Sequence, residues 1–145
     1  MESNLPLPSH PHIRRENVPD LVAPPGYFHL AAVSGAKLIF LAGQVPLNAS
    51  GELVGEKDAL TQATQCAKNL AACLREAGAR LEDVVRTTIY VVATEDDALA
   101  AVWRHLLESD FSAALQTPAT LLGVTRLGYP GQLVEIECTA AVALA

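Results

Sequence analysis

The chain has 145 residues, half of them hydrophobic, and a formal net charge of −6. This length suits a single domain with a substantial core, and no apolar run reaches the roughly 20 residues that a membrane span requires. The acidic balance disfavours nucleic acid as the main partner, because phosphate binding needs clustered Lys and Arg. The first residues show no signal-peptide pattern, so we expect a cytoplasmic protein.

Residues 1–26 contain six of the nine prolines and few apolar residues at helix or strand spacing. Such a segment is typical of an extended arm. We therefore expect an N-terminal arm over 1–26 and a folded domain over 27–145. The three cysteines follow no CxxC pattern, which predicts reduced structural thiols and no metal site.

Apolar runs at 28–33 and 37–42 flank Ser34-Gly35-Ala36 and predict a hairpin. Asp58 is a predicted N-cap for a helix that ends at Gly78, because apolar residues recur at three- and four-residue steps between them. A strand over 84–92, a second helix that opens at Thr94, and two strands within 118–144 follow.

The predicted order is therefore β-β-α-β-α-β-β, an α+β fold with a mixed sheet. Two helices can cover only one face of such a sheet. An uncovered face with apolar side chains usually meets another subunit, so we expect a symmetric oligomer.

The last strand carries two carboxylates on one face. Glu135 and Glu137 alternate with Val134, Ile136 and Cys138, which form a wholly apolar face. An unpaired charge within a strand is costly if it is buried. The acidic face must therefore meet solvent, a polar cavity or a subunit boundary.

Five ordered segments resemble the RidA/YjgF family. They are Pro24-Pro-Gly-Tyr27, Leu41-Ala-Gly-Gln-Val-Pro-Leu47, Glu76-Ala-Gly-Ala79, Asp83-Val-Val-Arg-Thr-Thr-Ile-Tyr90 and Leu133-Val-Glu-Ile-Glu137. The resemblance implies a chorismate-mutase-like fold, a homotrimer and small-molecule clefts between subunits. It also implies hydrolysis of reactive enamines and imines without a metal or cofactor.

The resemblance assigns Glu135 as the carboxylate that holds the attacking water. It places Tyr27 and the Gly43 amide near the substrate. The arginine that clamps the substrate carboxylate in active relatives falls on Ala119 or Thr120, so the chain lacks it there. An asparagine of the second helix is replaced by Trp103, and Arg126 lies a few residues downstream of the missing arginine.

Each of these residues also has a purely structural reading. Glu135 could be a hydrogen-bonded carboxylate at a subunit boundary, and Glu137 is expected to be solvated or paired with Arg86. Thr120 fits an ordinary strand position, and Trp103 fits the buried stripe of its helix. His29 has the chemistry for proton transfer and could face the cleft.

The sequence thus predicts a Rid-like hydrolase or deaminase that acts on an enamine, imine or related small metabolite. Without the arginine clamp, its substrate should be less anionic than 2-aminoacrylate. The alternative is a non-catalytic trimer that binds a small molecule. A nuclease role is disfavoured by the acidic balance.

Overall fold

The centre of the fold is a four-stranded mixed sheet in the order β3-β6-β4-β5. The computed structural model describes residues 9–144, so the first eight residues of the expected arm lie outside the description. The strands of this sheet are β3 (Ala36–Phe40), β4 (Val84–Val92), β5 (Ala119–Val124) and β6 (Val134–Ala143). β6 runs antiparallel to both β3 and β4, whereas β5 runs parallel to β4.

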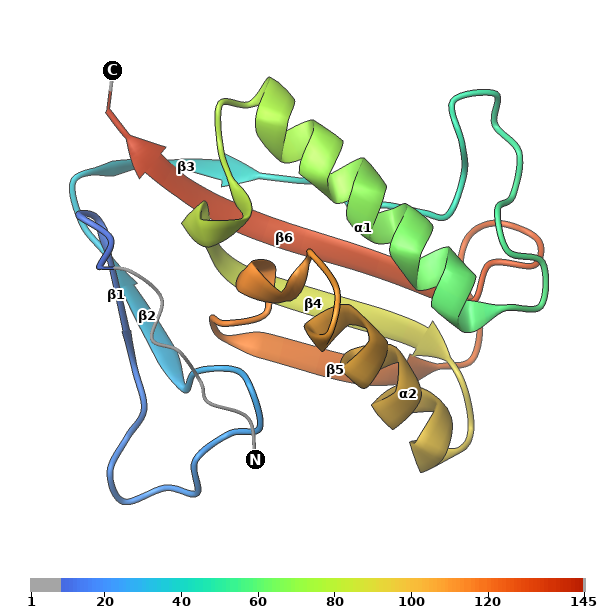
Figure 1. Ribbon diagram of the computed structural model, residues 1–145, viewed down its shortest axis with the longest axis horizontal. Coiled ribbons are helices and arrows are strands. Elements are labelled where there is room, and N and C mark those ends of the chain that lie inside the picture. The colour runs from blue at the N-terminus through green and yellow to red at the C-terminus, as the bar shows by residue number, and fades with distance from the viewer. Residues whose placement is uncertain (1–8, 145) are drawn as a thin grey trace.

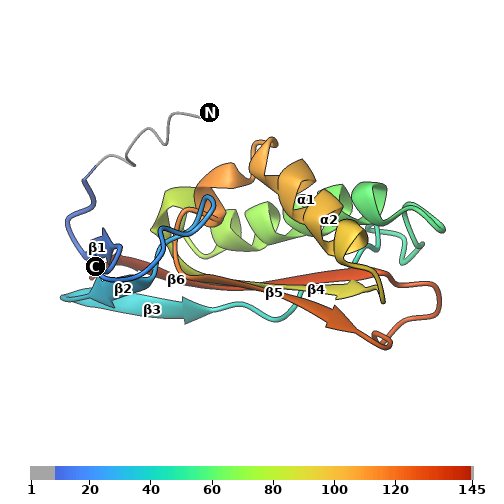
Figure 2. The same cartoon turned by 90° about the horizontal axis from the view of Figure 1, so that it is seen from below.

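Two helices pack on one face of this sheet. They are α1 (Ala59–Glu76) and α2 (Asp96–Leu107), and the short 3-10 turns η1 (Leu81–Asp83) and η2 (Ser112–Ala114) follow them in the chain. Figure 1 shows both helices in front of the sheet, and Figure 2 shows that the opposite face carries no helix. The predicted α+β architecture is confirmed.

Helix α1 begins where the sequence predicts it. The Asp58 side chain accepts a hydrogen bond from the Thr61 amide at 3.2 Å, and the Thr61 hydroxyl donates to it at 2.6 Å. This contact satisfies one of the free amides of the first turn. The helix ends just before Gly78, whose φ of +77° suits glycine because it has no Cβ.

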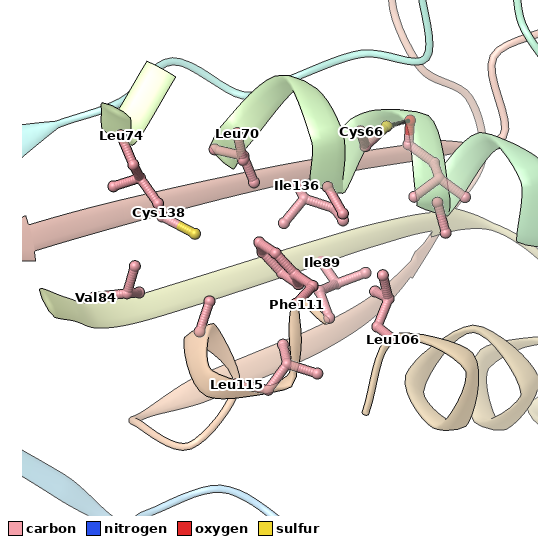
Figure 3. Packing of buried hydrophobic residues seen from close by; sticks show 14 of the residues in the cluster. Cys66, Leu70, Leu74, Val84, Ile89, Leu106, Phe111, Leu115, Ile136 and Cys138 are labelled. Atoms are coloured by element: carbon pink, nitrogen blue, oxygen red, sulfur yellow. Dashed lines mark hydrogen bonds between the residues drawn. The ribbon is translucent and has the colours of Figure 1, made fainter. Parts of the chain in front are cut away.

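The core lies between the helices and the sheet, as Figure 3 shows. Leu70 and Leu74 of α1 and Leu106 of α2 are fully buried against Ile89 of β4 and Ile136 of β6. The buried strand residues occupy alternate positions, so the other half of each central strand points to the uncovered face.

The predicted hairpin of the two N-terminal runs is wrong. Strand β2 (Leu30–Val33) pairs antiparallel with β1 (Ile13–Glu16), a strand inside the expected arm, whereas β3 pairs with β6. The chain turns at Gly35, with φ +61°, and leaves one sheet for the other. Short apolar strands do not encode their partner, so the tertiary contacts decide the pairing.

Polar contacts hold the N-terminal arm against the rest of the domain. One Arg15 Nη donates to the carbonyls of Glu82 and Val84, each at 2.7 Å. His10 Nε2 lies 2.8 Å from Asp83 Oδ1, with both side chains largely buried. Residues 9–16 therefore follow the end of η1 rather than extending into solvent.

Large apolar side chains remain exposed on the helix-free face. Phe40 and Leu38 of β3 are 76% and 47% exposed, and Leu122 of β5 is 40% exposed. The strand register places all three on the side that faces away from the helices. Such a patch is typical of a protein interface.

Over residues 9–144, none of the helices has the length and apolar character to cross a membrane.

Two leucines of α1 test this packing. We expect Leu70→Ala, at a fully buried position, to lower the free energy of unfolding by about 2–5 kcal/mol because it leaves a cavity. Leu60→Ala, at a position that is 38% exposed on the same helix, should cost about 0.5 kcal/mol. Urea unfolding followed by circular dichroism measures both, and equal losses would contradict the described core.

Candidate functional site

Polar side chains form a row on the uncovered face of the two central strands. β4 contributes Arg86, Thr88 and Tyr90, and β6 contributes Glu135 and Glu137. Thr88 lies opposite Glu137, and Tyr90 lies opposite Glu135. Both carboxylates therefore point away from the helical layer, on a face that solvent or another subunit can reach.

Glu135 is half-buried and is held by a residue that the sequence analysis missed. Gln132, which is 4% exposed, donates through Nε2 to Glu135 Oε1 at 3.2 Å. The same Nε2 donates to the Val134 carbonyl at 3.0 Å, and Gln132 Oε1 accepts from the Tyr129 amide at 3.1 Å. A single glutamine after a turn gives no sequence signal. Its contacts fix one carboxylate oxygen of Glu135 in position.

Gly43 lies directly against the Glu135 carboxylate. The amide of Gln44 donates to the Ile136 carbonyl at 2.8 Å, and the Ile136 amide donates back at 3.2 Å. This pairing brings the segment after β3 beside β6. A Cβ on Gly43 would lie only 2.8 Å from the carboxyl carbon of Glu135, so a larger residue would displace that carboxylate.

The other predicted site residues gather at the free edge of β5. Tyr27, Trp103, Ala119 and Thr120 line one cavity of about 460 Å³. The Tyr27 and Trp103 rings meet edge to face, with centroids 5.9 Å apart and an interplanar angle of 90°. Trp103 Nε1 donates to the Pro25 carbonyl at 3.3 Å, which fixes the indole as one wall of the cavity. We call this space the aromatic cavity.

A single chain does not bring all of these residues into one cleft. Gly43 and Glu135 do not line the aromatic cavity. Thr120 lies opposite Thr88, which in turn lies opposite Glu137, so two strand spacings, or about 10 Å, separate Thr120 from β6. The predicted residues thus form two groups, one at the β3-β6 side of the sheet and one at the β5 edge.

Of the two expectations for Glu137, solvation or pairing with Arg86, the ion pair does not form. Glu137 Oε1 instead accepts a hydrogen bond from the Tyr90 hydroxyl at 2.5 Å. This bond raises the pKa of Tyr90, because it stabilises the protonated phenol beside a carboxylate. Arg86 donates to the Thr120 hydroxyl at 3.1 Å. Arg126 is exposed after β5 and lines neither the aromatic cavity nor the surroundings of Arg86.

The His29 side chain is hydrogen-bonded to the N-terminal arm and belongs to neither of the two groups of predicted site residues. Its Nδ1 accepts a hydrogen bond from the Val18 amide at 2.9 Å, and its own amide donates to Asn17 at 3.1 Å. These two bonds tie β2 to the chain segment after β1. The His29 imidazole therefore has a structural role, because it holds the arm by a hydrogen bond.

The cysteines differ in burial. Cys66 and Cys138 are buried, whereas Cys73 is partly exposed. Burial raises the pKa of both the Cys66 and the Cys138 thiols to about 12. These two thiols therefore stay protonated near neutral pH and are poor nucleophiles.

The chain matches known proteins over most of its length. A family described as Endoribonuclease L-PSP matches residues 21–142. A RutC family protein of Synechocystis is 34% identical over 121 residues, which cover 83% of this chain and 89% of that protein. The mitochondrial protein mmf2 of Schizosaccharomyces pombe is 32% identical over 76% of this chain and 84% of that protein.

The solved structures give the same result for the fold. A protein of unknown function from the conserved Rid protein family, YyfB of Yersinia pestis, is 35% identical. It superposes with a TM-score of 0.79 over 90% of this chain and 99% of that chain.

Substitution of Gly43 tests how the Glu135 carboxylate is held. We expect Gly43→Ala to displace the carboxylate and to weaken its bond with Gln132, because the new methyl group occupies its place. The side-chain amide signals of Gln132 in an NMR spectrum should shift. Glu76→Ala, at an exposed position near the end of α1, is the control and should leave them in place. Unchanged signals in Gly43→Ala would contradict the described contact.

Thiol burial predicts selective alkylation. In the folded protein at neutral pH, iodoacetamide should modify Cys73 first, while Cys66 and Cys138 stay unmodified until the protein unfolds. Peptide mass spectrometry of a reaction time course measures this order. Early modification of Cys66 would show that its face of helix α1 does not pack against the sheet.

Proposed function

Because the chain belongs to the Endoribonuclease L-PSP family, which is the RidA/YjgF family, we propose that it is a deaminase that hydrolyses a reactive enamine, imine or related small metabolite. The observation that carries the proposal is the position of Glu135. Its carboxylate is half-buried, is fixed through one oxygen by Gln132, and faces the backbone at Gly43. A carboxylate that is held in place beside a glycine can bind and orient a water molecule.

The proposed reaction needs one base that later acts as an acid. Glu135 accepts a proton from water as the water oxygen bonds to the carbon of the C=N group. The same proton then passes to the nitrogen of the tetrahedral intermediate. From a protonated imine, the C–N bond then breaks as the Glu135 carboxylate takes the remaining hydroxyl proton, so that ammonia leaves and the carbon keeps the oxygen as a carbonyl. A carboxylate held in place suits this exchange, because general acid–base catalysis needs the group within hydrogen-bond reach of the proton that it transfers.

A homotrimer would complete the cleft. The two groups of predicted residues lie on separate parts of one chain, and exposed Leu38, Phe40 and Leu122 flank them on the helix-free face. Packing that face against a second copy would bury the apolar side chains. We propose that it also brings the aromatic cavity of one subunit to the Glu135 of its neighbour.

The walls of the aromatic cavity define the proposed substrate class. Thr120 offers a hydroxyl where active relatives carry the arginine clamp, and Tyr27 and Trp103 offer aromatic surface. A hydroxyl binds a carboxylate less strongly than a guanidinium does, since it offers one donor and carries no positive charge. The proposed substrate therefore has an apolar or aromatic side chain and is less anionic than 2-aminoacrylate.

The second candidate is a trimer that binds a small molecule without turnover. The observation that favours it is the absence of arginine at Ala119 and Thr120. In either case we propose a cytoplasmic protein that uses no cofactor, with the arm over 1–26 and the domain over 27–145. These last proposals rest on the sequence pattern.

An imine-hydrolysis assay tests the first candidate. Imines are generated in situ by an L-amino acid oxidase from aromatic, small apolar and charged amino acids, and ammonia release is followed with and without the protein. We expect the largest acceleration for aromatic imines. Glu135→Gln should lower it by about 100-fold or more, because the base is lost while the shape is kept.

The control for that loss is Glu76→Gln, at an exposed position near the end of α1. It should keep full activity. The fluorescence of Trp103, the single tryptophan of the chain, reports binding in the aromatic cavity independently of turnover. A fluorescence change without acceleration on any imine would reject the deaminase and support the binding trimer.

A further inference from the structure

Two buried glutamines connect helix α1 to the segment that carries Glu135. Gln62 of α1 is fully buried, and Gln132, in the turn before β6, is almost fully buried. A buried side-chain amide lowers stability unless its donors and its acceptor find partners. The partners of these two amides therefore show what the glutamines hold in place.

Both N–H donors and the oxygen of the Gln62 amide are bonded to backbone groups. Its Nε2 donates to the carbonyls of Gly55 at 2.9 Å and Gly131 at 3.0 Å, and its Oε1 accepts from the Leu133 amide at 2.6 Å. Exchange of the amide oxygen and nitrogen would set the oxygen against two carbonyls, so these partners fix the orientation of the amide. Gln62 thereby holds the backbone on both sides of Gln132.

The Gln132 amide is bonded in the same way, and one of its bonds reaches Glu135. Its Oε1 accepts from the Tyr129 amide, and its Nε2 donates both to the Val134 carbonyl and to Oε1 of Glu135. The two backbone bonds orient the amide. The third bond transmits that orientation to the carboxylate.

The position of one carboxylate oxygen determines the position of the other. A Cβ on Gly43 would meet Oε2 of Glu135 first, so Oε2 lies on the side of Gly43. Because Oε1 is bonded to Gln132, Oε2 is the oxygen that remains for the water molecule of the proposed reaction. A carboxylate that rotated freely would direct this oxygen away from the water for part of the time, which lowers the rate of proton transfer.

We propose that Gln132 is a positioning residue for Glu135 and that Gln62 of α1 holds Gln132 in place for this task. The inference rests on the proposed hydrolysis and names the residues that orient its base. Both amides are already buried within the single chain. A second copy packed on the helix-free face therefore leaves these contacts intact.

Gln132→Met tests the contact with Glu135, because it keeps the length of the side chain and removes the donor. In the imine-hydrolysis assay, we expect kcat to fall about tenfold or more while KM stays within about twofold, since Gln132 contacts Glu135 and does not line the aromatic cavity. Lys68→Met places the same side chain at an exposed position of α1 and should keep both constants. Full kcat in Gln132→Met would overturn the proposal.

Combination with Glu135→Gln separates positioning from a general effect on the fold. If Gln132 acts through the carboxylate, Gln132→Met should lower the residual rate of Glu135→Gln by less than about twofold. An equal tenfold loss in both backgrounds would show an effect that does not pass through Glu135, and this too would overturn the proposal.

Gln62→Met should reproduce the fall in kcat with KM unchanged, although Gln62 does not contact Glu135. Thermal melting checks that this variant folds. Gln62→Glu is the milder second variant, because a protonated glutamic acid keeps the acceptor and one donor. A Gln62 variant that folds and keeps full kcat would overturn the role of α1.

The NMR signal of the Glu135 carboxyl carbon reports positioning without turnover. In protein that contains carboxyl-labelled glutamate, this is the signal lost in Glu135→Gln. It should shift in Gln132→Met and stay in place in Lys68→Met. A wild-type protein that accelerates no imine would reject the proposed function, and this signal then decides the inference alone. A shift in Gln132→Met would support it, and an unshifted signal would overturn it.

Discussion

The antiparallel pairing of β4 with β6 is the constraint on which the rest of the structure depends. Each strand is divided by its two-residue period into a buried and an uncovered half. Ile89 and Ile136 lie opposite each other in the core, so Tyr90 must lie opposite Glu135 on the other face. Slippage by one residue would exchange the two faces and bury the carboxylates.

The two carboxylates of β6 have different surroundings, although they are chemically identical and lie two residues apart. Glu135 receives an amide donor from Gln132 and contacts the backbone at Gly43. Glu137 accepts a hydrogen bond from the Tyr90 hydroxyl and lies near Arg86 and Thr88. Two identical carboxylates on one strand thus have different hydrogen-bond partners, because the adjoining segments differ.

The absence of helices on one face links the site to assembly. Apolar Leu38, Phe40 and Leu122 and the polar row occupy the same surface, so any contact that buries the former also encloses the latter. The aromatic cavity at the β5 edge lies about two strand spacings from β6. A cleft that uses both groups requires more than one copy, and this explains why local motifs do not reveal the complete site.

The sequence by itself determined the helices, the central strands and the face on which Glu135 lies, because periodicity and the Asp58 cap are local properties. The family resemblance placed Gly43 near the substrate, and the structure shows a different constraint, since a Cβ there would meet the Glu135 carboxylate. Only the tertiary structure decided that β2 pairs with β1, that Gln132 holds Glu135, and that Arg86 bonds to Thr120 rather than to Glu137. These contacts join residues whose spacing carries no period, so they depend on how the strands and loops pack.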